Sequence, residues 1–125
     1  MIVSLFHVAL GGAIGACLRY LASLAALRWI GSGFPYGTLL INVAGSFTIG
    51  LLVVVLAERD AARLTPFLVT GVLGGFTTFS AFSLETISLV ERGQTGAAAI
   101  YVLGSVALSL IGVSAGLALA RGVLT

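Results

Sequence analysis

The stretch that decides the fold is Gly71-Val72-Leu73-Gly74-Gly75-Phe76-Thr77-Thr78-Phe79-Ser80-Ala81-Phe82-Ser83. It lies inside a long apolar run, yet two adjacent glycines followed by two β-branched threonines form a continuous helix poorly. A break inside a membrane is tolerated only where the freed backbone is buried in protein or lines a cavity. Freed carbonyl oxygens are also the ligands with which broken helices hold sodium ions. The stretch therefore predicts a helix that is interrupted in the middle of a membrane.

The rest of the chain consists of apolar runs long enough to cross a membrane. The 125 residues are 59% hydrophobic and only 8% charged, whereas a soluble domain carries roughly 25% charged residues. Charged residues and turns separate four runs, each longer than the roughly 20 residues that a spanning helix needs: residues 2–27, 36–57, 64–90 and 95–120. The absence of period-two alternation favours helices over a β-barrel. We expect an all-α membrane protein, with a single transmembrane domain over residues 1–125 and the third of its four helices broken.

The charged residues and the cysteine exclude several classes of function. Six arginines scattered through an apolar chain form no basic patch for nucleic acid. The single cysteine, Cys17, cannot form an internal disulfide, and no cluster of cysteines and histidines has zinc spacing. The sequence contains no nucleotide site, catalytic dyad or redox centre, so we expect no enzyme and only passive transport.

The arginines at the two membrane faces are nearly balanced. The side that carries the N-terminus has Arg59, Arg63 and Arg121, and the opposite side has Arg28 and Arg92. An excess of positive charge on the inner side normally fixes the orientation of a membrane protein. The balance therefore predicts insertion in both orientations, unless one residue such as Arg19 decides the matter. Four helices can hardly enclose a polar path unaided, so a transport protein of this size is expected to be a homodimer.

Two rows of polar residues lie within the apolar runs. The rows are Thr38, Asn42 and Ser46 in the second run, and Tyr101, Ser105 and Ser109 in the fourth. A spacing of four residues puts each row on one face of its helix. Such residues serve either as interhelical hydrogen bonds or as donors along a polar pathway, and both interpretations stay open at this point.

The first and third runs also contain aromatic and charged side chains with more than one possible role. Phe79 and Phe82 share a helix face and alternate with Ser80 and Ser83; the rings serve either as packing or as a lining. Arg19 and Glu85 each cost about 2.5–3.5 kcal/mol at the centre of a spanning helix.

The two charged residues each allow two interpretations. Arg19 either attracts an anion through its positive potential or caps helix carbonyls. Glu85 lies within about one turn of the end of its run, where its side chain could also reach the membrane surface.

Together these residues resemble the fluoride channel family of microbial membranes, the Fluc or CrcB family, over essentially the whole chain. The matching motifs are Gly11-Gly12-x-x-Gly15-Ala16-x-x-Arg19-Tyr20, Gly37-Thr38-Leu39-x-x-Asn42-x-x-Gly45-Ser46-Phe47-x-x-Gly50 and Gly71-x-x-Gly74-Gly75-Phe76-Thr77-Thr78-Phe79-Ser80-x-Phe82-Ser83-x-Glu85. The third motif is highly specific. The chain departs from the pattern at Ala81, where many relatives have threonine, so no hydroxyl acts at that position here.

The resemblance implies a passive, fluoride-selective channel that exports cytoplasmic fluoride for detoxification. It implies an antiparallel homodimer of dual topology, surrounded by the lipids of the cell membrane, with two fluoride pathways. A structural sodium ion would lie on the dimer axis, held by the backbone carbonyls of Gly74 and Thr77 from both chains. The implied pathway residues are Asn42, Phe79, Phe82, Tyr101, Ser105 and Ser109. Further pathway or vestibule candidates are Arg19, Thr38, Ser80, Ser83 and Glu85.

Two other functions fit parts of the sequence but not all of it. A small proton-coupled multidrug exporter is also a four-span dimer of dual topology, but its cationic substrates would need an acidic residue deep in the bundle, typically in the first run, which has none. A non-transporting scaffold subunit would explain the small residues on helix faces. It gives no reason for glycines beside paired threonines or for two polar rows.

Overall fold

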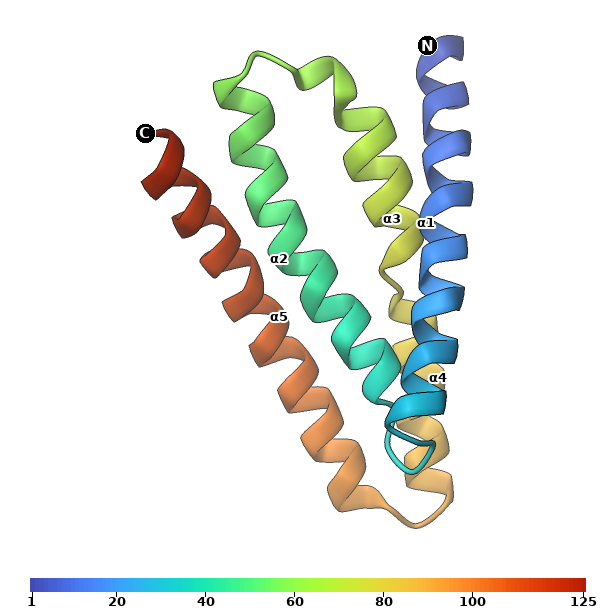
Figure 1. Ribbon diagram of the computed structural model, residues 1–125. Coiled ribbons are helices and arrows are strands. Elements are labelled where there is room, and N and C mark those ends of the chain that lie inside the picture. Colours follow the sequence, from blue (N-terminus) through green and yellow to red (C-terminus); the bar gives the residue numbers. More distant parts are fainter.

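The computed structural model describes all 125 residues as four membrane-length helices joined by short loops (Figure 1). The three continuous helices are α1 (Ile2–Trp29), α2 (Tyr36–Glu58) and α5 (Thr95–Leu124). The third span, Ala62–Glu91, is built from several shorter pieces. Each of the four units is long and apolar enough to cross a membrane, which confirms the predicted all-helical class.

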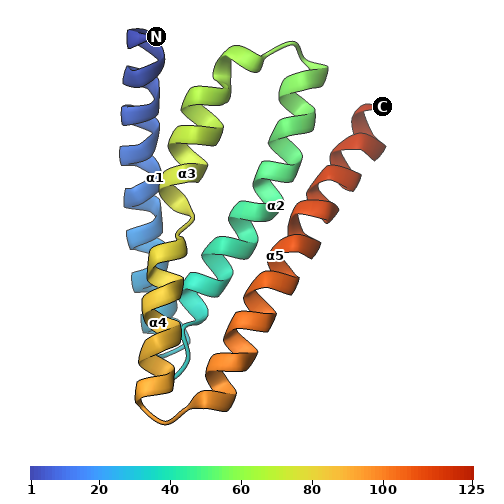
Figure 2. The ribbon, with the colours of Figure 1, turned by 180° about the vertical axis from the view of Figure 1, so that it is seen from behind.

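The third span departs from a regular α-helix along much of its length. Its pieces are a single 3₁₀ turn, η1 (Ala62–Leu64), a π-helical segment, η2 (Pro66–Leu73), a short α3 (Gly74–Phe76) and α4 (Phe79–Glu91). Thr77 and Thr78 lie between α3 and α4 in extended conformation, with φ/ψ of −79°/157° and −151°/122°. The view from behind shows this thin link between the two halves of the span (Figure 2). The third span is therefore interrupted at the two threonines.

The adjacent glycines before the threonines are helical, which corrects part of the prediction. Gly74 has φ −62° and ψ −36°, and Gly74 and Gly75 both belong to α3. Gly75 instead permits close contact with α1, because a Cβ built there would lie 2.5 Å from the carbonyl oxygen of Gly12. On the opposite side of the contact, a Cβ on Gly15 would clash with the carbonyl of Val72. Close helix packing, and not the break, explains Gly75, whereas a Cβ on Gly74 would make only an ordinary contact, 3.7 Å from the Val69 carbonyl oxygen.

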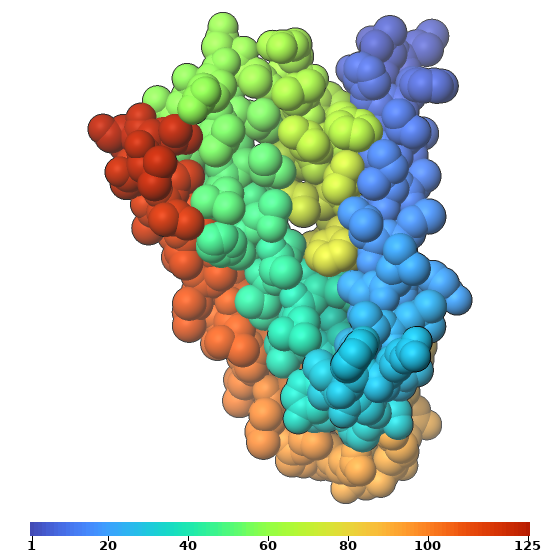
Figure 3. Space-filling view, in the orientation of Figure 1, coloured from blue at the N-terminus to red at the C-terminus, as the bar shows by residue number.

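The spans associate as two helix pairs. α1 packs along η2 and α3, and α2 packs along α5. Both chain termini and the turn between α2 and η1 lie at one end of the molecule, while residues 30–35 and 92–94 form the loops at the other end (Figure 1). A narrow gap between α2 and the third span is visible in the space-filling view (Figure 3).

Little of a single chain is buried. Only 17 of the 125 residues are buried, and the main cluster is small: Leu89, Ala98 and Tyr101. Many large apolar side chains are exposed, above all on α1 and α5. Such a surface is stable only against lipid or another protein surface, which agrees with a membrane location.

We predict that Gly15→Ala destabilises the contact between α1 and the third span. Its new methyl group would meet the Val72 carbonyl and lie 2.9 Å from the amide nitrogen of Phe76, and overpacking of this kind costs about 1–3 kcal/mol. Thermal unfolding in detergent should show a lower midpoint. The control is Gly12→Ala on the same helix, where a Cβ has no neighbour within 4 Å. Equal midpoints for the two variants would refute the close-contact argument.

Candidate functional site

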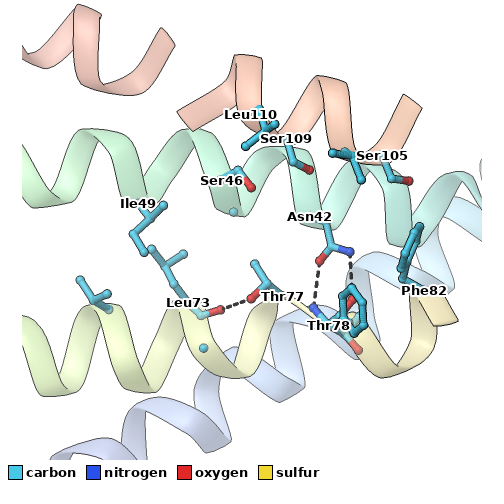
Figure 4. Close-up of a pocket in the computed structure, with 15 residues that line it drawn as sticks. Asn42, Ser46, Ile49, Leu73, Thr77, Thr78, Phe82, Ser105, Ser109 and Leu110 are labelled. Carbon is cyan, nitrogen blue, oxygen red and sulfur yellow. Dashed lines mark hydrogen bonds between the residues drawn. The ribbon is translucent and has the colours of Figure 1, made fainter. Parts of the chain in front are cut away.

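A cavity of about 470 Å³ lies beside the break in the third span (Figure 4). Side chains from α2, α5 and both halves of the third span line it. Its lining includes seven of the residues that the resemblance implies for sodium or fluoride: Asn42, Gly74, Thr77, Phe79, Phe82, Ser105 and Ser109. The fold thus gathers residues from three distant stretches of sequence around one space.

The side chain of Asn42 forms hydrogen bonds with the backbone at the break. Its amide nitrogen donates to the carbonyl oxygen of Thr78 at 2.9 Å, and its amide oxygen accepts the Thr78 backbone N–H at 2.8 Å (Figure 4). One residue of α2 therefore satisfies both backbone groups of an extended residue in the membrane interior. A primary amide carries two N–H groups, so one donor of Asn42, which lines the cavity, remains for a guest.

The two threonine side chains complete the ends of the adjoining helices. Thr77 donates its backbone N–H and its hydroxyl to the carbonyl of Leu73, both at 2.9 Å. Thr78 is the N-cap of α4, and its hydroxyl accepts the backbone N–H of Ala81 at 3.2 Å. Threonine is a favoured N-cap residue because its oxygen satisfies an otherwise free amide. The pair thus ends one helix and starts the next.

The break leaves two backbone carbonyls of the cavity lining without their helical donors. The N–H of Thr78, four residues after Gly74, is taken by Asn42. The N–H of Ala81, four residues after Thr77, is taken by the Thr78 hydroxyl. Carbonyl oxygens suit a hard cation, and no group of acidic, histidine or cysteine side chains could hold a metal elsewhere. The carbonyls of Gly74 and Thr77 therefore fit the ligand type expected for sodium.

Arg19 satisfies a third carbonyl at the break. Its Nε–H donates to the carbonyl oxygen of Gly75 at 3.0 Å. This hydrogen bond matches the interpretation of Arg19 as a cap of helix carbonyls, and Arg19 is not among the residues that line the cavity. Its side chain nevertheless brings a positive charge next to the interruption.

The two phenylalanines begin a row of aromatic contacts. The ring centroids of Phe79 and Phe82 are 5.6 Å apart, and those of Phe82 and Tyr101 are 5.1 Å apart. Phe79 is 78% exposed in the single chain although it sits on a membrane span. Its outer side must therefore be covered by lipid or by another protein chain.

The hydroxyl row of α5 is divided between two environments. The Ser105 hydroxyl is buried and has no hydrogen-bond partner, although Ser105 lines the cavity. An unpaired buried hydroxyl costs about 1–3 kcal/mol. Tyr101 is buried outside the cavity, with its hydroxyl 3.5 Å from Glu85 Oε1. Thr38 donates to the same carboxylate oxygen at 2.6 Å, so the Glu85 side chain is tied to α2.

Two serine candidates lie outside the cavity. The Ser80 hydroxyl is 3.3 Å from that of Thr78, and the Ser83 hydroxyl donates to the carbonyl of Phe79 at 2.9 Å. Neither residue lines the cavity. The pairing of Asn42 with Thr78 was not foreseen from the sequence, although an asparagine and a pair of threonines inside neighbouring apolar runs were a usable signal.

We predict that Asn42→Leu destabilises the protein, because both backbone groups of Thr78 lose their partner. Leaving buried polar groups unpaired costs about 1–3 kcal/mol each. Thermal unfolding should show a lower midpoint, and the Thr78 amide should exchange with deuterium faster. Ser46→Ala, one turn along α2 in the same cavity, removes no hydrogen bond of the structure and is the control. An unchanged exchange rate at Thr78 in Asn42→Leu would contradict this role.

Comparison with known proteins gives a consistent result. A family model described as "CrcB-like protein, Camphor Resistance" matches residues 6–117. The chain is 59% identical to the "Fluoride-specific ion channel FluC" of Cereibacter sphaeroides over 122 residues, 98% of both chains. It is 52% identical to the protein of the same name from Ruegeria sp., over the full length of both, and 53% identical to that of Agrobacterium fabrum, over 95% of this chain and 97% of the relative. With its four membrane-length helices, this multi-pass protein of the cell membrane belongs to the CrcB-like protein family.

Proposed function

We propose that the protein is a passive fluoride channel of the cell membrane and not an enzyme. The names of its relatives support this function, and the observation that carries it in this chain is the unpartnered Ser105 hydroxyl at the cavity. Fluoride is small and strongly hydrated, so a pore must replace its water with hydrogen-bond donors. A buried free hydroxyl is such a donor, and a bound anion would remove the cost of leaving it unpaired.

Other groups of the cavity extend the set of donors. Asn42 has a second amide N–H, and Ser109 lines the cavity one helical turn beyond Ser105. Aromatic rings carry a positive edge, so Phe79 and Phe82 can meet an anion edge-on and hold it weakly. Conduction needs binding that is favourable enough for the ion to enter and weak enough for it to leave. A mixture of hydroxyl, amide and ring-edge contacts meets both needs.

We extend the pathway from the cavity to Tyr101 and its neighbours. Phe82 contacts Tyr101, whose hydroxyl lies next to Glu85, and Thr38 donates to the same carboxylate. Fluoride would reach these groups from the cavity past the Phe82 ring. Arg19 contributes positive potential from the side of α1. Ser80 and Ser83 do not line the cavity, and we assign them no contact with the ion. The proposed physiological use, which follows from the weak acidity of HF, is the escape of fluoride that has entered the cell as the acid.

We further propose that two chains form an antiparallel dimer with two pores. The single chain leaves Phe79 and Gly74 exposed at the edge of the cavity, so a second surface is needed to close it. Three arginines at one end and two at the other give little preference for one orientation. A second copy in the opposite orientation would close both cavities by symmetry.

A sodium ion on the dimer axis is the third part of the proposal. The carbonyls of Gly74 and Thr77 lack their helical donors, and two chains would together offer four such oxygens. The ion would supply positive charge that joins the broken spans of both chains. No side-chain ligand is required, because oxygen ligands of this kind suit a hard cation.

The proposed function predicts prompt fluoride release, read with a fluoride electrode, from liposomes that contain the purified protein. Liposomes loaded with chloride should release no chloride. Phe79→Ile or Phe82→Ile should slow release by about tenfold or more, since loss of a ring-edge contact of roughly 1.4 kcal/mol corresponds to that factor. The control is Leu110→Ile, which changes an aliphatic side chain of the same cavity. Wild-type liposomes that retain fluoride would exclude the channel, and full-rate phenylalanine variants would exclude the rings.

The proposed assembly predicts that a C-terminal tag is accessible from both sides of the membrane in intact vesicles. Exchange of sodium for N-methylglucamine should lower the unfolding temperature of the detergent-solubilised dimer, because the shared ion is lost. Potassium chloride at equal ionic strength separates a specific sodium effect from a salt effect. A tag found on one side only would rule out the antiparallel arrangement, and an unchanged unfolding temperature would rule out the ion.

A further inference from the structure

A second cavity, of about 230 Å³, lies at the end of the molecule opposite the termini. The last turns of α1, the loop between α1 and α2, the first turn of α2 and the last turns of α4 line it. Its polar lining residues include Thr38, Glu85, Ser88 and Arg92. The sequence motifs gave no indication of this space, because it depends on a loop and on the end of a helix.

One layer of side chains separates the second cavity from the first. Thr38 and Glu85 line the second cavity, and the Thr38 hydroxyl donates a hydrogen bond to the Glu85 carboxylate. The Tyr101 hydroxyl contacts Glu85 from the other side, and the Tyr101 ring packs on Phe82, which lines the first cavity. Phe34 of the loop packs edge-on against Tyr101 at 5.5 Å and lines the second cavity. The second cavity is therefore the space that an ion would enter next beyond Tyr101.

The charges of this cavity lie on one face of α4. Glu85, Ser88 and Arg92 are spaced i, i+3 and i+7, a spacing that puts them on one side of a helix. Glu85 is the only acidic residue and Arg92 the only basic residue of the lining. The single hydrogen bond of the Arg92 side chain is a long one, 3.4 Å from Nε to the Ser88 carbonyl. The four remaining guanidinium N–H donors are free.

An anion that approaches this cavity meets opposing electrostatic effects. The Glu85 carboxylate repels it, and the field of a narrow cleft with apolar walls is stronger than that of an open surface. The positive charge of Arg92 offsets the repulsion at the outer end, before the ion reaches the carboxylate. The positive end of the α2 dipole also faces this cavity, because the N-cap Pro35 and the first helical residues up to Thr38 line it.

We propose that Arg92 sets the rate of fluoride transport at the second cavity. Its positive charge concentrates fluoride there and offsets the repulsion by the Glu85 carboxylate, without contacting the ion in the phenylalanine-lined cavity. This inference rests on the proposed function as a fluoride channel. It assigns the transport rate at low salt to a residue outside the family motifs quoted above.

The test is the unitary fluoride current in planar bilayers for Arg92→Lys, Arg92→Gln and Arg92→Glu. At an ionic strength of about 10 mM the Debye length is about 30 Å, so the current should fall about threefold in Arg92→Gln and about tenfold in Arg92→Glu, and stay near wild type in Arg92→Lys. At about 1 M of a salt with a large, impermeant anion the Debye length is about 3 Å, and the currents should converge.

Arg28→Gln is the matched control, because Arg28 lies at the same end of the molecule and does not line the cavity. It should lower the low-salt current less than Arg92→Gln does, because the Arg28 charge lies outside the lining. Currents that are equal in all Arg92 variants, or that differ equally at low and high salt, would overturn the role of Arg92 while the channel function stands. Absence of fluoride current in the wild type would instead overturn the proposed function itself. Should Arg92→Glu fail to fold, the comparison of Arg92→Gln with Arg92→Lys still decides the outcome.

Discussion

The paired hydrogen bonds between the Asn42 amide and the backbone of Thr78 are the interaction on which the rest of the site depends. Hydrocarbon offers no water to backbone groups, so extended residues inside a membrane persist only where protein satisfies them. Because Asn42 bonds the backbone N–H and carbonyl of Thr78, the helix can stop after Phe76 and start again at Phe79. The restart fixes where Phe79 and Phe82 lie, and it leaves carbonyls of the preceding turn without donors.

The side of the break that faces α1 is held by different means. Glycines at the contact bring the two backbones together, and Arg19 reaches across to the Gly75 carbonyl. A close backbone contact fixes the first half of the third span, while α2 fixes the residues of the interruption. The span is thus irregular in conformation but fully supported on two sides, and the cavity occupies the remaining direction, toward α5.

Composition and run length were enough to predict four membrane helices, because hydrophobicity alone determines them. The poor helix propensity of paired threonines indicated the region of the interruption. The sequence could not assign Gly75 to helix packing, since that role depends on how close α1 comes. It also could not reveal that Glu85 is held by Thr38, 47 positions away, because such pairing depends on the arrangement of the spans. The roles of the cavity residues in conduction stay predictions.

The split of the third span also has a consequence for its helix dipoles. An unbroken helix would present its partial charges only at the two membrane surfaces. Here the segment that ends at Phe76 directs a negative end toward the membrane interior, and α4 begins with a positive end only three residues later. Ions of opposite sign can therefore be stabilised at the same depth by the peptide groups of a single span.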